Sequence, residues 1–145
     1  MINPMQKLII CLAVVILSLG AVGSKAADPK SDKSAAEEKK GYKNIAPEEF
    51  DKMRQKGTNV VLDVRTKKEY QEGHIPGSVL IDFNSPDFDK EVAKLDKSKT
   101  YLVHCAAGGR SARACKKMES MNFQSLYNLE GGMGAWQKQG KPVEK

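Results

Sequence analysis

The sequence predicts an α/β domain, with a mainly parallel sheet that is covered by helices on both faces. From Tyr42 onward, short apolar runs alternate with amphipathic segments. The runs at 59–64 and 100–104 are apolar and β-branched, as buried strands are. The segments between such runs have helical spacing, and a helix is the usual connection between two parallel strands.

Four strands are expected from these runs, and glycine or polar residues bound most of them. The strand at 59–64 (NVVLDV) follows the break at Gly57. The strand at 100–104 (TYLVH) is the second long apolar run. Shorter strands are expected at 78–82 and 125–129.

Four helices are expected between and after the strands, at 47–56, 85–95, 111–121 and 132–139. The first opens with Pro47 at the first helical turn and stops at Gly57. Asn84 precedes the second helix as a candidate cap. In the third, positions 112, 114, 115, 118 and 121 are apolar and form one buried stripe.

Length and charge exclude several classes of protein. A chain of 145 residues fits one domain. The net charge is +6, the charges of both signs are interleaved, and no basic stripe typical of a nucleic-acid binder is present. Three cysteines without a CxxC pair predict neither a disulfide framework nor a zinc site, and no cofactor is expected.

The first 26 residues have the pattern of a secretory signal peptide. Lys7 precedes an uncharged apolar run over 8–22, and the small residues Ser24 and Ala26 lie where a signal peptidase reads. The run is shorter than the roughly 20 apolar residues of a membrane span. We therefore expect cleavage after Ala26 and a periplasmic or otherwise exported protein. The alternative is an uncleaved leader that anchors the chain in the membrane.

Residues 27–41 are expected to be a flexible linker, and the domain is expected to span 42–145. The segment 28–40 (DPKSDKSAAEEKK) is charged and almost free of large apolar side chains. Such a segment cannot bury enough surface to offset the entropy of ordering it.

The segment after the strand at 100–104 carries the chemistry. It reads Cys105, Ala106, Ala107, Gly108, Gly109, Arg110 and Ser111, with a helix expected to begin at about Ser111. Small residues let the backbone curl so that successive amides point inward and, with the helix N-terminus, bind an anion. Arg110 adds a permanent cation.

Cys105 is therefore a candidate nucleophile. A cysteine at a strand end is by itself more often a buried core residue. The glycines, the arginine and the helix start together favour the thiolate, which is the reactive form.

The chain resembles the single-domain rhodaneses, which are sulfurtransferases. The resemblance rests on five segments that occur in the family's order: Asp63-Val64-Arg65, Glu69-Tyr70, Gly73-His74-Ile75-Pro76-Gly77-Ser78, the loop 105–111, and Leu129-Glu130-Gly131-Gly132 with Trp136. It covers roughly residues 42–142 and implies a rhodanese fold, a five-stranded mostly parallel sheet flanked by helices. It also implies that Cys105 accepts a sulfane sulfur as a persulfide and passes it on.

The same resemblance suggests the substrates. Related domains that act on phosphate or arsenate have arginine six residues after the cysteine, whereas Arg110 is five residues after Cys105. A small sulfur-containing anion is the expected donor, and a thiol, a protein thiol included, or cyanide is the expected acceptor. Rhodanese loops often carry polar or basic side chains where this chain has Ala106 and Ala107, so donor binding is expected to rest on the loop amides and Arg110.

Other polar residues are interpreted as structural. Asp63 and Arg65 are expected to pair with other groups at a strand end. His104 precedes Cys105, but neighbouring side chains of a strand point to opposite faces. Cys115 lies on the apolar stripe of its helix, and its alternative role is a resolving thiol for Cys105.

Two functions remain open at this point. The first is an exported sulfurtransferase, and the alternative is a low-turnover persulfide carrier or a partner-docking module. No nucleic-acid partner is expected, and membrane contact is expected only if the leader is not cleaved.

Overall fold

The computed structural model describes residues 41–145, in which five strands alternate with five helices. The signal peptide predicted at 1–26 lies outside the described residues, as does the predicted linker except for Gly41. The strands are β1 (Lys43–Ile45), β2 (Val60–Asp63), β3 (Val79–Leu80), β4 (Thr100–His104) and β5 (Ser125–Leu129). The helices are α1 (Pro47–Gln55), α2 (Lys67–Glu72), α3 (Phe88–Ala93), α4 (Gly109–Ser120) and α5 (Gly132–Lys138).

The strands form one sheet in the order β1-β5-β4-β2-β3, and every neighbouring pair is parallel. Strand β4 lies in the middle, with β5 on one side and β2 on the other. The carboxyl ends of β2 and β4 meet at one edge, because Asp63 is in register with His104. The predicted five-stranded parallel sheet is confirmed.

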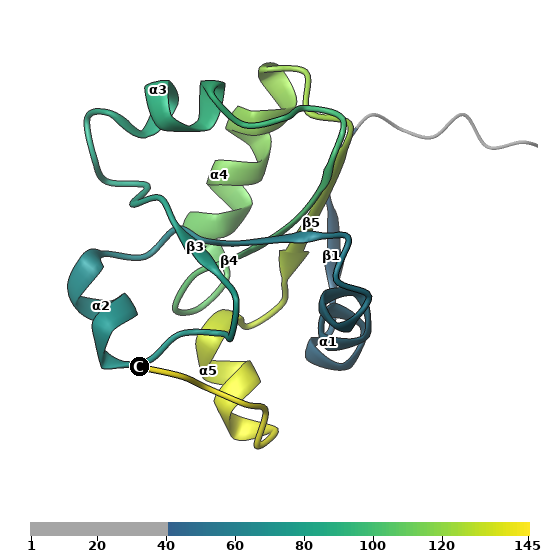
Figure 1. The fold of residues 1–145 in the computed structure, drawn as a ribbon, viewed down its shortest axis with the longest axis vertical. Helices are drawn as coiled ribbons and strands as arrows, with labels where there is room; N and C mark the ends of the chain where they lie inside the picture. Colours follow the sequence, from purple (N-terminus) through teal and green to yellow (C-terminus); the bar gives the residue numbers. More distant parts are fainter. Residues whose placement is uncertain (1–40) are drawn as a thin grey trace, which may run out of the picture. The chain divides into compact units, whose positions relative to one another are not determined.

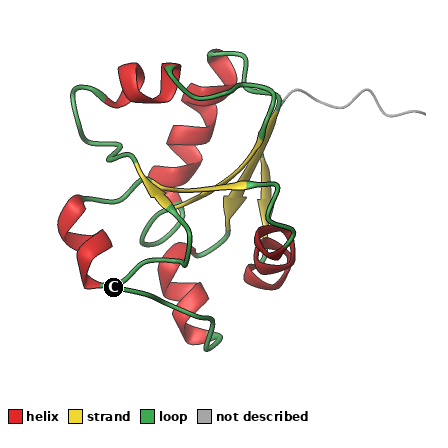
Figure 2. Cartoon of the chain, in the orientation of Figure 1, coloured by secondary structure: helices red, strands yellow, loops and turns green. Residues whose placement is uncertain are grey.

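Helices cover both faces of the sheet, as predicted (Figures 1 and 2). On one face, Phe88 and Val92 of α3 and Cys115 and Met118 of α4 belong to one core cluster with Tyr101 of β4. On the other face, side chains of α1 and α5 pack against β4, β5 and β2; the largest of these side chains are Phe50 and Trp136. Figure 1 shows α3 and α4 above the sheet and α1 and α5 below it.

Several boundaries differ from the prediction. The strand expected at 78–82 is limited to Val79–Leu80, and the helix expected at 85–95 is limited to Phe88–Ala93, with Asp87 and not Asn84 at its N-cap. Helix α4 begins at Gly109, two residues before Ser111. Strand β1 and helix α2 did not emerge from the apolar pattern, because β1 buries only Ile45 and α2 buries no residue.

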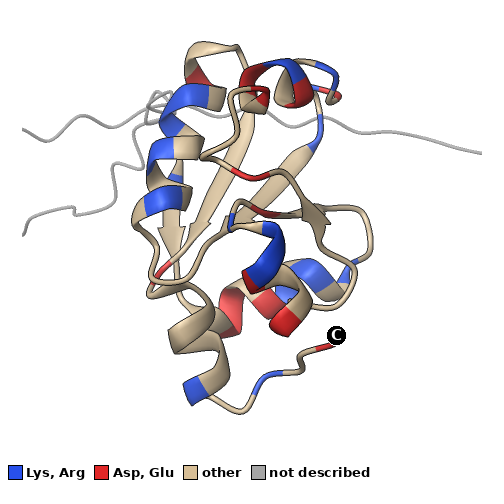
Figure 3. Ribbon diagram, turned by 90° about the vertical axis from the view of Figure 1, so that its left-hand side faces the viewer, with Lys and Arg blue, Asp and Glu red and all other residues tan. Residues whose placement is uncertain are grey.

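No helix within residues 41–145 is long and apolar enough to cross a membrane. Charges of both signs are spread over the described ribbon (Figure 3). The four basic residues of α4 are Arg110, Arg113, Lys116 and Lys117. Three of them have partners: Arg110 pairs with Glu69, Lys117 pairs with Asp89, and Arg113 lies over the ring of Phe83.

Candidate active site

Cys105 lies directly after β4, at the carboxyl edge of the sheet. The side chain is only 1% exposed. The next three residues form a tight turn, and Gly108 adopts φ +96° as the N-cap of α4. That conformation suits glycine, which has no Cβ. The thiol therefore lies between the end of the central strand β4 and the start of α4, a helix of 12 residues.

The sulfur of Cys105 accepts hydrogen bonds from the loop that follows it. The Gly108 amide donates to Sγ at 3.1 Å, and the Ser111 hydroxyl donates to Sγ at 3.3 Å. Burial alone raises the pKa of the thiol, but the hydroxyl of Ser111 and the amides of Ser111, Ala107 and Gly108 outweigh it and lower the pKa below 9.0. The environment therefore stabilises the thiolate.

The start of α5 holds the other side of the loop. The Met133 amide donates to the Cys105 carbonyl at 2.7 Å, and the Gly134 amide donates to the Ala106 carbonyl at 3.0 Å. With these two carbonyls bound to α5, the loop amides are free to face the sulfur. The two groups of hydrogen bonds fix the loop from both sides.

Gly132 allows this close approach of α5. It adopts φ +56°, and a Cβ atom at this position would lie 2.5 Å from the Cys105 carbonyl oxygen and 2.8 Å from the Ala107 nitrogen. Real Cβ contacts essentially never come so close, and these neighbours are backbone atoms that cannot turn away. Only glycine fits here without displacing the loop.

The match to a known family follows this geometry. The model of the rhodanese-like domain family matches residues 46–139, which include every helix and all strands except β1. The chain belongs to the rhodanese-like family.

Curated relatives and solved structures agree with this assignment. Thiosulfate sulfurtransferase GlpE of Pseudomonas savastanoi pv. phaseolicola is 35% identical over 96 residues, which cover 66% of this chain and 87% of that protein. YtwF of Bacillus subtilis, whose name also contains the word sulfurtransferase, is 39% identical over 82 residues, 57% of this chain and 77% of that protein. A rhodanese-related protein from Thermoplasma volcanium superposes with a TM-score of 0.63 at 29% identity, over 71% of this chain and 98% of that one.

Arg110 of this rhodanese-like domain is paired with Glu69, 41 positions earlier in the chain. Its guanidinium binds both carboxylate oxygens of Glu69, at 2.8 and 2.6 Å. The hydrogen bonds from Arg110 lower the pKa of Glu69 to about 2, so this carboxylate is ionised at neutral pH. Glu69 also closes the capping box of α2 with Thr66. Arg110 is thus held by α2 at the rim of the loop, where its charge is neutralised.

Asp63 and Arg65 form a buried pair one strand away from the loop. The Arg65 Nη2 lies 2.7 Å from Asp63 Oδ2 and donates to the Gly73 carbonyl at 2.8 Å. His104 is fully buried on the opposite face from Cys105, edge-on to Phe50, as strand alternation predicts. Burial lowers the pKa of His104 to about 4 against the opposing effect of Asp63, so the imidazole is neutral at pH 7.

Cys115 packs in the core beneath the loop. It is 0% exposed among the side chains of α3, α4 and β4, and it is not bonded to Cys105 in this structure. Burial raises the pKa of its thiol to about 12. The thiol therefore stays protonated at neutral pH and is a poor nucleophile.

A cavity of about 330 Å³ lies beside the loop of this rhodanese-like domain. It is lined by Arg65, Glu69, Glu72, Gly73, Ala106, Met133, Gly134 and Gln137. The wall thus joins the end of β2, helix α2, the loop and the start of α5. Within residues 41–145, no group of three or more His, Cys, Asp or Glu side chains is placed to hold a metal ion.

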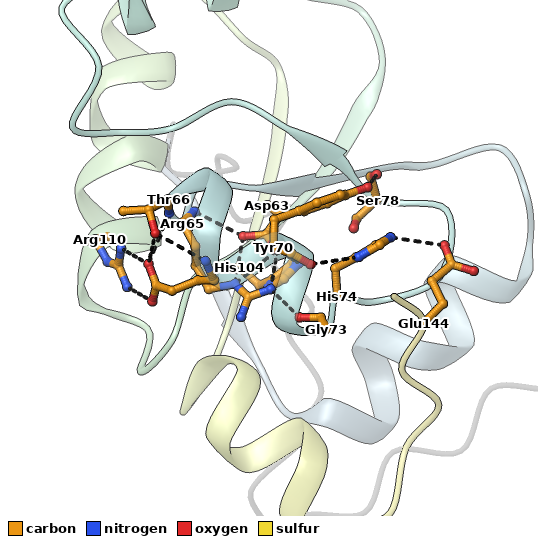
Figure 4. A network of polar contacts seen from close by, with 11 residues as sticks. Asp63, Arg65, Thr66, Tyr70, Gly73, His74, Ser78, His104, Arg110 and Glu144 are labelled. Atoms are coloured by element: carbon orange, nitrogen blue, oxygen red, sulfur yellow. Dashed lines mark hydrogen bonds and ion pairs between the residues drawn. The ribbon is translucent and has the colours of Figure 1, made fainter.

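The segment after α2 is tied to residues near the C-terminus (Figure 4). The His74 amide donates to the Glu144 carbonyl at 2.8 Å, and the Glu144 amide donates back to the His74 carbonyl at 2.9 Å. The His74 ring stacks on Tyr70 with centroids 3.7 Å apart. The Tyr70 hydroxyl donates to the Ser78 carbonyl at 2.8 Å. These contacts fix the turn that carries Gly73 into the cavity wall.

The roles of Glu69 and of the α5 amides in the site are not predicted from the sequence. The spacing of Thr66 and Glu69 is that of a capping box, and this signal marks a helix start at α2. No local sequence pattern predicts that the amides of Met133 and Gly134 bind the carbonyls of the loop. Their place against the loop follows from tertiary packing, for which Gly131 and Gly132 are the nearest sequence marker.

Proposed function

We propose that this chain is a sulfurtransferase that carries a sulfane sulfur as a persulfide on Cys105. The donor is thiosulfate or another persulfide, and the acceptor is a thiol or cyanide. The observation that carries the proposal is the ring of donors around the Cys105 sulfur, with the Gly108 amide at 3.1 Å and the Ser111 hydroxyl at 3.3 Å. Such a ring stabilises a thiolate before the reaction and a persulfide anion after it.

The chemistry needs two half-reactions at one sulfur atom. The Cys105 thiolate attacks the outer sulfur of thiosulfate, the sulfur–sulfur bond of the donor breaks, and sulfite leaves with the electron pair. The acceptor thiolate or cyanide then attacks the terminal sulfur of the persulfide, and Cys105 leaves as a thiolate. A covalent intermediate shared by two half-reactions gives ping-pong kinetics.

The names of relatives support this role. GlpE of Pseudomonas savastanoi is named a thiosulfate sulfurtransferase, and its 35% identity extends over 96 residues. Arg110 lies five residues after Cys105, which gives the short loop of a sulfur-binding domain and not the longer loop of a phosphatase.

The test is the mass of the protein after incubation with sulfur donors. We expect a gain of one sulfur atom on the peptide that contains Cys105, and cyanide should remove it. Cys105→Ser should abolish the gain. Cys115→Ser is the matched control and should retain it, because Cys115 is buried in the core. If thiosulfate and polysulfide both leave the parent mass unchanged, the sulfurtransferase proposal is wrong.

A persulfide carrier with low turnover is the second candidate function. It is favoured by the charge balance at the loop, since Ala106 and Ala107 are uncharged and Arg110 is bound by Glu69. Stoichiometric loading of Cys105 without repeated turnover would distinguish the carrier from the enzyme.

We further propose that the chain is exported. The support is the charged start, the apolar run at 8–22 and the small residues Ser24 and Ala26. N-terminal sequencing of the product should find Ala27 as the first residue. Intact Met1 on a soluble cytosolic product would contradict export.

A further inference from the structure

The cavity beside the loop has the size and place of a binding site for a small sulfur compound. Its volume of about 330 Å³ is at the lower end of the range for small-molecule sites. The loop contributes Ala106 to the wall, and Ala106 follows Cys105 directly. Across the cavity, Met133 and Gly134 offer an apolar surface at the start of α5. A molecule in this space lies next to the residue that follows the nucleophile.

The charged side chains of the cavity wall differ in whether they are already paired with another residue. Glu69 is ionised, but both of its oxygens bind Arg110. Glu72 is exposed and makes no ion pair with any residue in 41–145. The wall therefore presents one free negative charge.

Arg65 is the basic residue of the wall, and its charge is already paired with that of Asp63. It is only 5% exposed, and its Nε and Nη2 atoms bind the Asp63 carboxylate and the Gly73 carbonyl. The Nη1 atom takes part in none of these hydrogen bonds. A buried guanidinium with an unused pair of N–H groups is a donor for a carboxylate.

We propose that this cavity binds the α-amino-acid part of a thiol of the cysteine class, which is the acceptor of the sulfur from Cys105. The ammonium group faces Glu72, the carboxylate binds Nη1 of Arg65, and the thiol lies toward Ala106. The inference rests on the proposed function. In the transfer step the acceptor thiolate attacks the terminal sulfur of the Cys105 persulfide. The bond from that sulfur to Cys105 breaks, and the electron pair stays on Cys105 as its thiolate.

Truncated thiols test the two halves of the site without altering the buried Arg65. Transfer from sulfur-loaded protein is measured with L-cysteine, with cysteamine (which lacks the carboxylate), with 3-mercaptopropionate (which lacks the ammonium) and with uncharged 2-mercaptoethanol. Each thiol is compared between the parent and Glu72→Gln, so that differences in intrinsic thiol reactivity cancel. Glu49→Gln removes an exposed carboxylate of α1 outside the cavity and is the matched control.

We expect Glu72→Gln to lower kcat/KM for L-cysteine and cysteamine by about two- to fivefold relative to 2-mercaptoethanol, as for one partly exposed ion pair. The ratio for 3-mercaptopropionate should not fall. In the parent, L-cysteine should react faster than cysteamine, because only L-cysteine can bind Arg65. Equal ratios for all four thiols in Glu72→Gln and Glu49→Gln would overturn the inference, and so would equal rates with L-cysteine and cysteamine.

Binding of S-methyl-L-cysteine to the resting protein provides a readout that needs no sulfur transfer. This unreactive analogue should bind by calorimetry, more weakly to Glu72→Gln and unchanged to Glu49→Gln. Absence of binding overturns the inference alone. Failure of every donor to deliver sulfur to cyanide, measured on the same preparations, overturns the proposed function instead.

Discussion

Removal of the Ser111 hydroxyl tests whether the loop controls the acidity of Cys105. In the structure the hydroxyl lies 3.3 Å from Sγ and 3.1 Å from the Gly108 carbonyl oxygen, and Ser111 is fully buried. Ser111→Ala removes this donor and leaves the Gly108 amide in place at 3.1 Å. The substitution deletes one atom and creates no clash.

The magnitude follows from the kind of bond that is lost. A hydrogen bond to a charged group contributes about 1.5–3 kcal/mol. The hydroxyl has one proton and two acceptors, so the lower end applies, and about 1.4 kcal/mol corresponds to one pKa unit. Since the hydroxyl stabilises the thiolate, its loss should raise the pKa of Cys105 and, at a pH below the pKa, lower the thiolate fraction about tenfold.

The pH dependence of alkylation by iodoacetamide measures this pKa. At a pH below both pKa values, Ser111→Ala should react about tenfold more slowly than the parent, because the thiolate fraction falls by that factor. Above both values the two rates should converge. Ser120→Ala is the matched control, since Ser120 lies on the same helix but is exposed and bonds only to the Lys117 carbonyl.

An unchanged pH midpoint in Ser111→Ala would refute the assignment of the low pKa to this hydroxyl, and the backbone amides would then account for all of it. A slower rate at every pH, with the same midpoint, would indicate a distorted loop instead.

Three further predictions concern the surroundings of the loop. Gly132→Ala should strongly reduce persulfide formation on Cys105, because its Cβ would lie 2.5 Å from the Cys105 carbonyl oxygen; donor-dependent mass gain measures this, and parent-like loading contradicts it. The pKa of His104 is about 4 in the folded protein and 6.5 ordinarily, so the unfolded chain binds a proton first as the pH falls. The contribution of the neutral His104 to the free energy of unfolding is therefore fully present above pH 6.5 and decreases by about 1.4 kcal/mol per pH unit as the pH drops toward 4. Urea unfolding across that range should show this slope, and His104→Phe should lack it; equal slopes would assign the effect to other groups. Cys115 should stay unmodified by iodoacetamide at pH 8 in the folded protein while Cys105 reacts, because burial raises the pKa of the Cys115 thiol to about 12; peptide mapping that finds both modified would contradict this high pKa.

The sequence predicts the parts of the fold that have a local signal. Strand β4 and helix α4 are recognised because one is a continuous apolar run and the other has a buried stripe that includes Cys115 and Met118. Helix α2 has no apolar face, so only the capping box of Thr66 and Glu69 marks it. Its six residues cover no part of the core, and hydrophobic periodicity therefore cannot detect it.

In the candidate site, too, the contacts between neighbouring residues can be predicted from the sequence, and those between distant segments cannot. Cys105 and the amides that face it lie within seven consecutive residues, so their arrangement can be inferred from this short segment of the sequence. Glu69 and Arg110 are 41 positions apart, and the Met133 amide that binds the Cys105 carbonyl belongs to another helix. Such contacts depend on the sheet order, and a single sequence gives no measure of which distant segments meet.

The hydrogen bonds from α5 to the loop also mean that the active-site loop is complete only when the last helix of the domain has been synthesised. Cys105 leaves the ribosome before Met133 and Gly134, which bind the loop carbonyls at 2.7 and 3.0 Å. A nascent chain that ends before Gly131 has the thiol but lacks the second support of its loop. A pairing between distant segments must first overcome the entropy of loop closure. The thiolate of Cys105 is therefore a chemical marker of complete folding, since a thiol in the unfolded chain keeps its ordinary acidity.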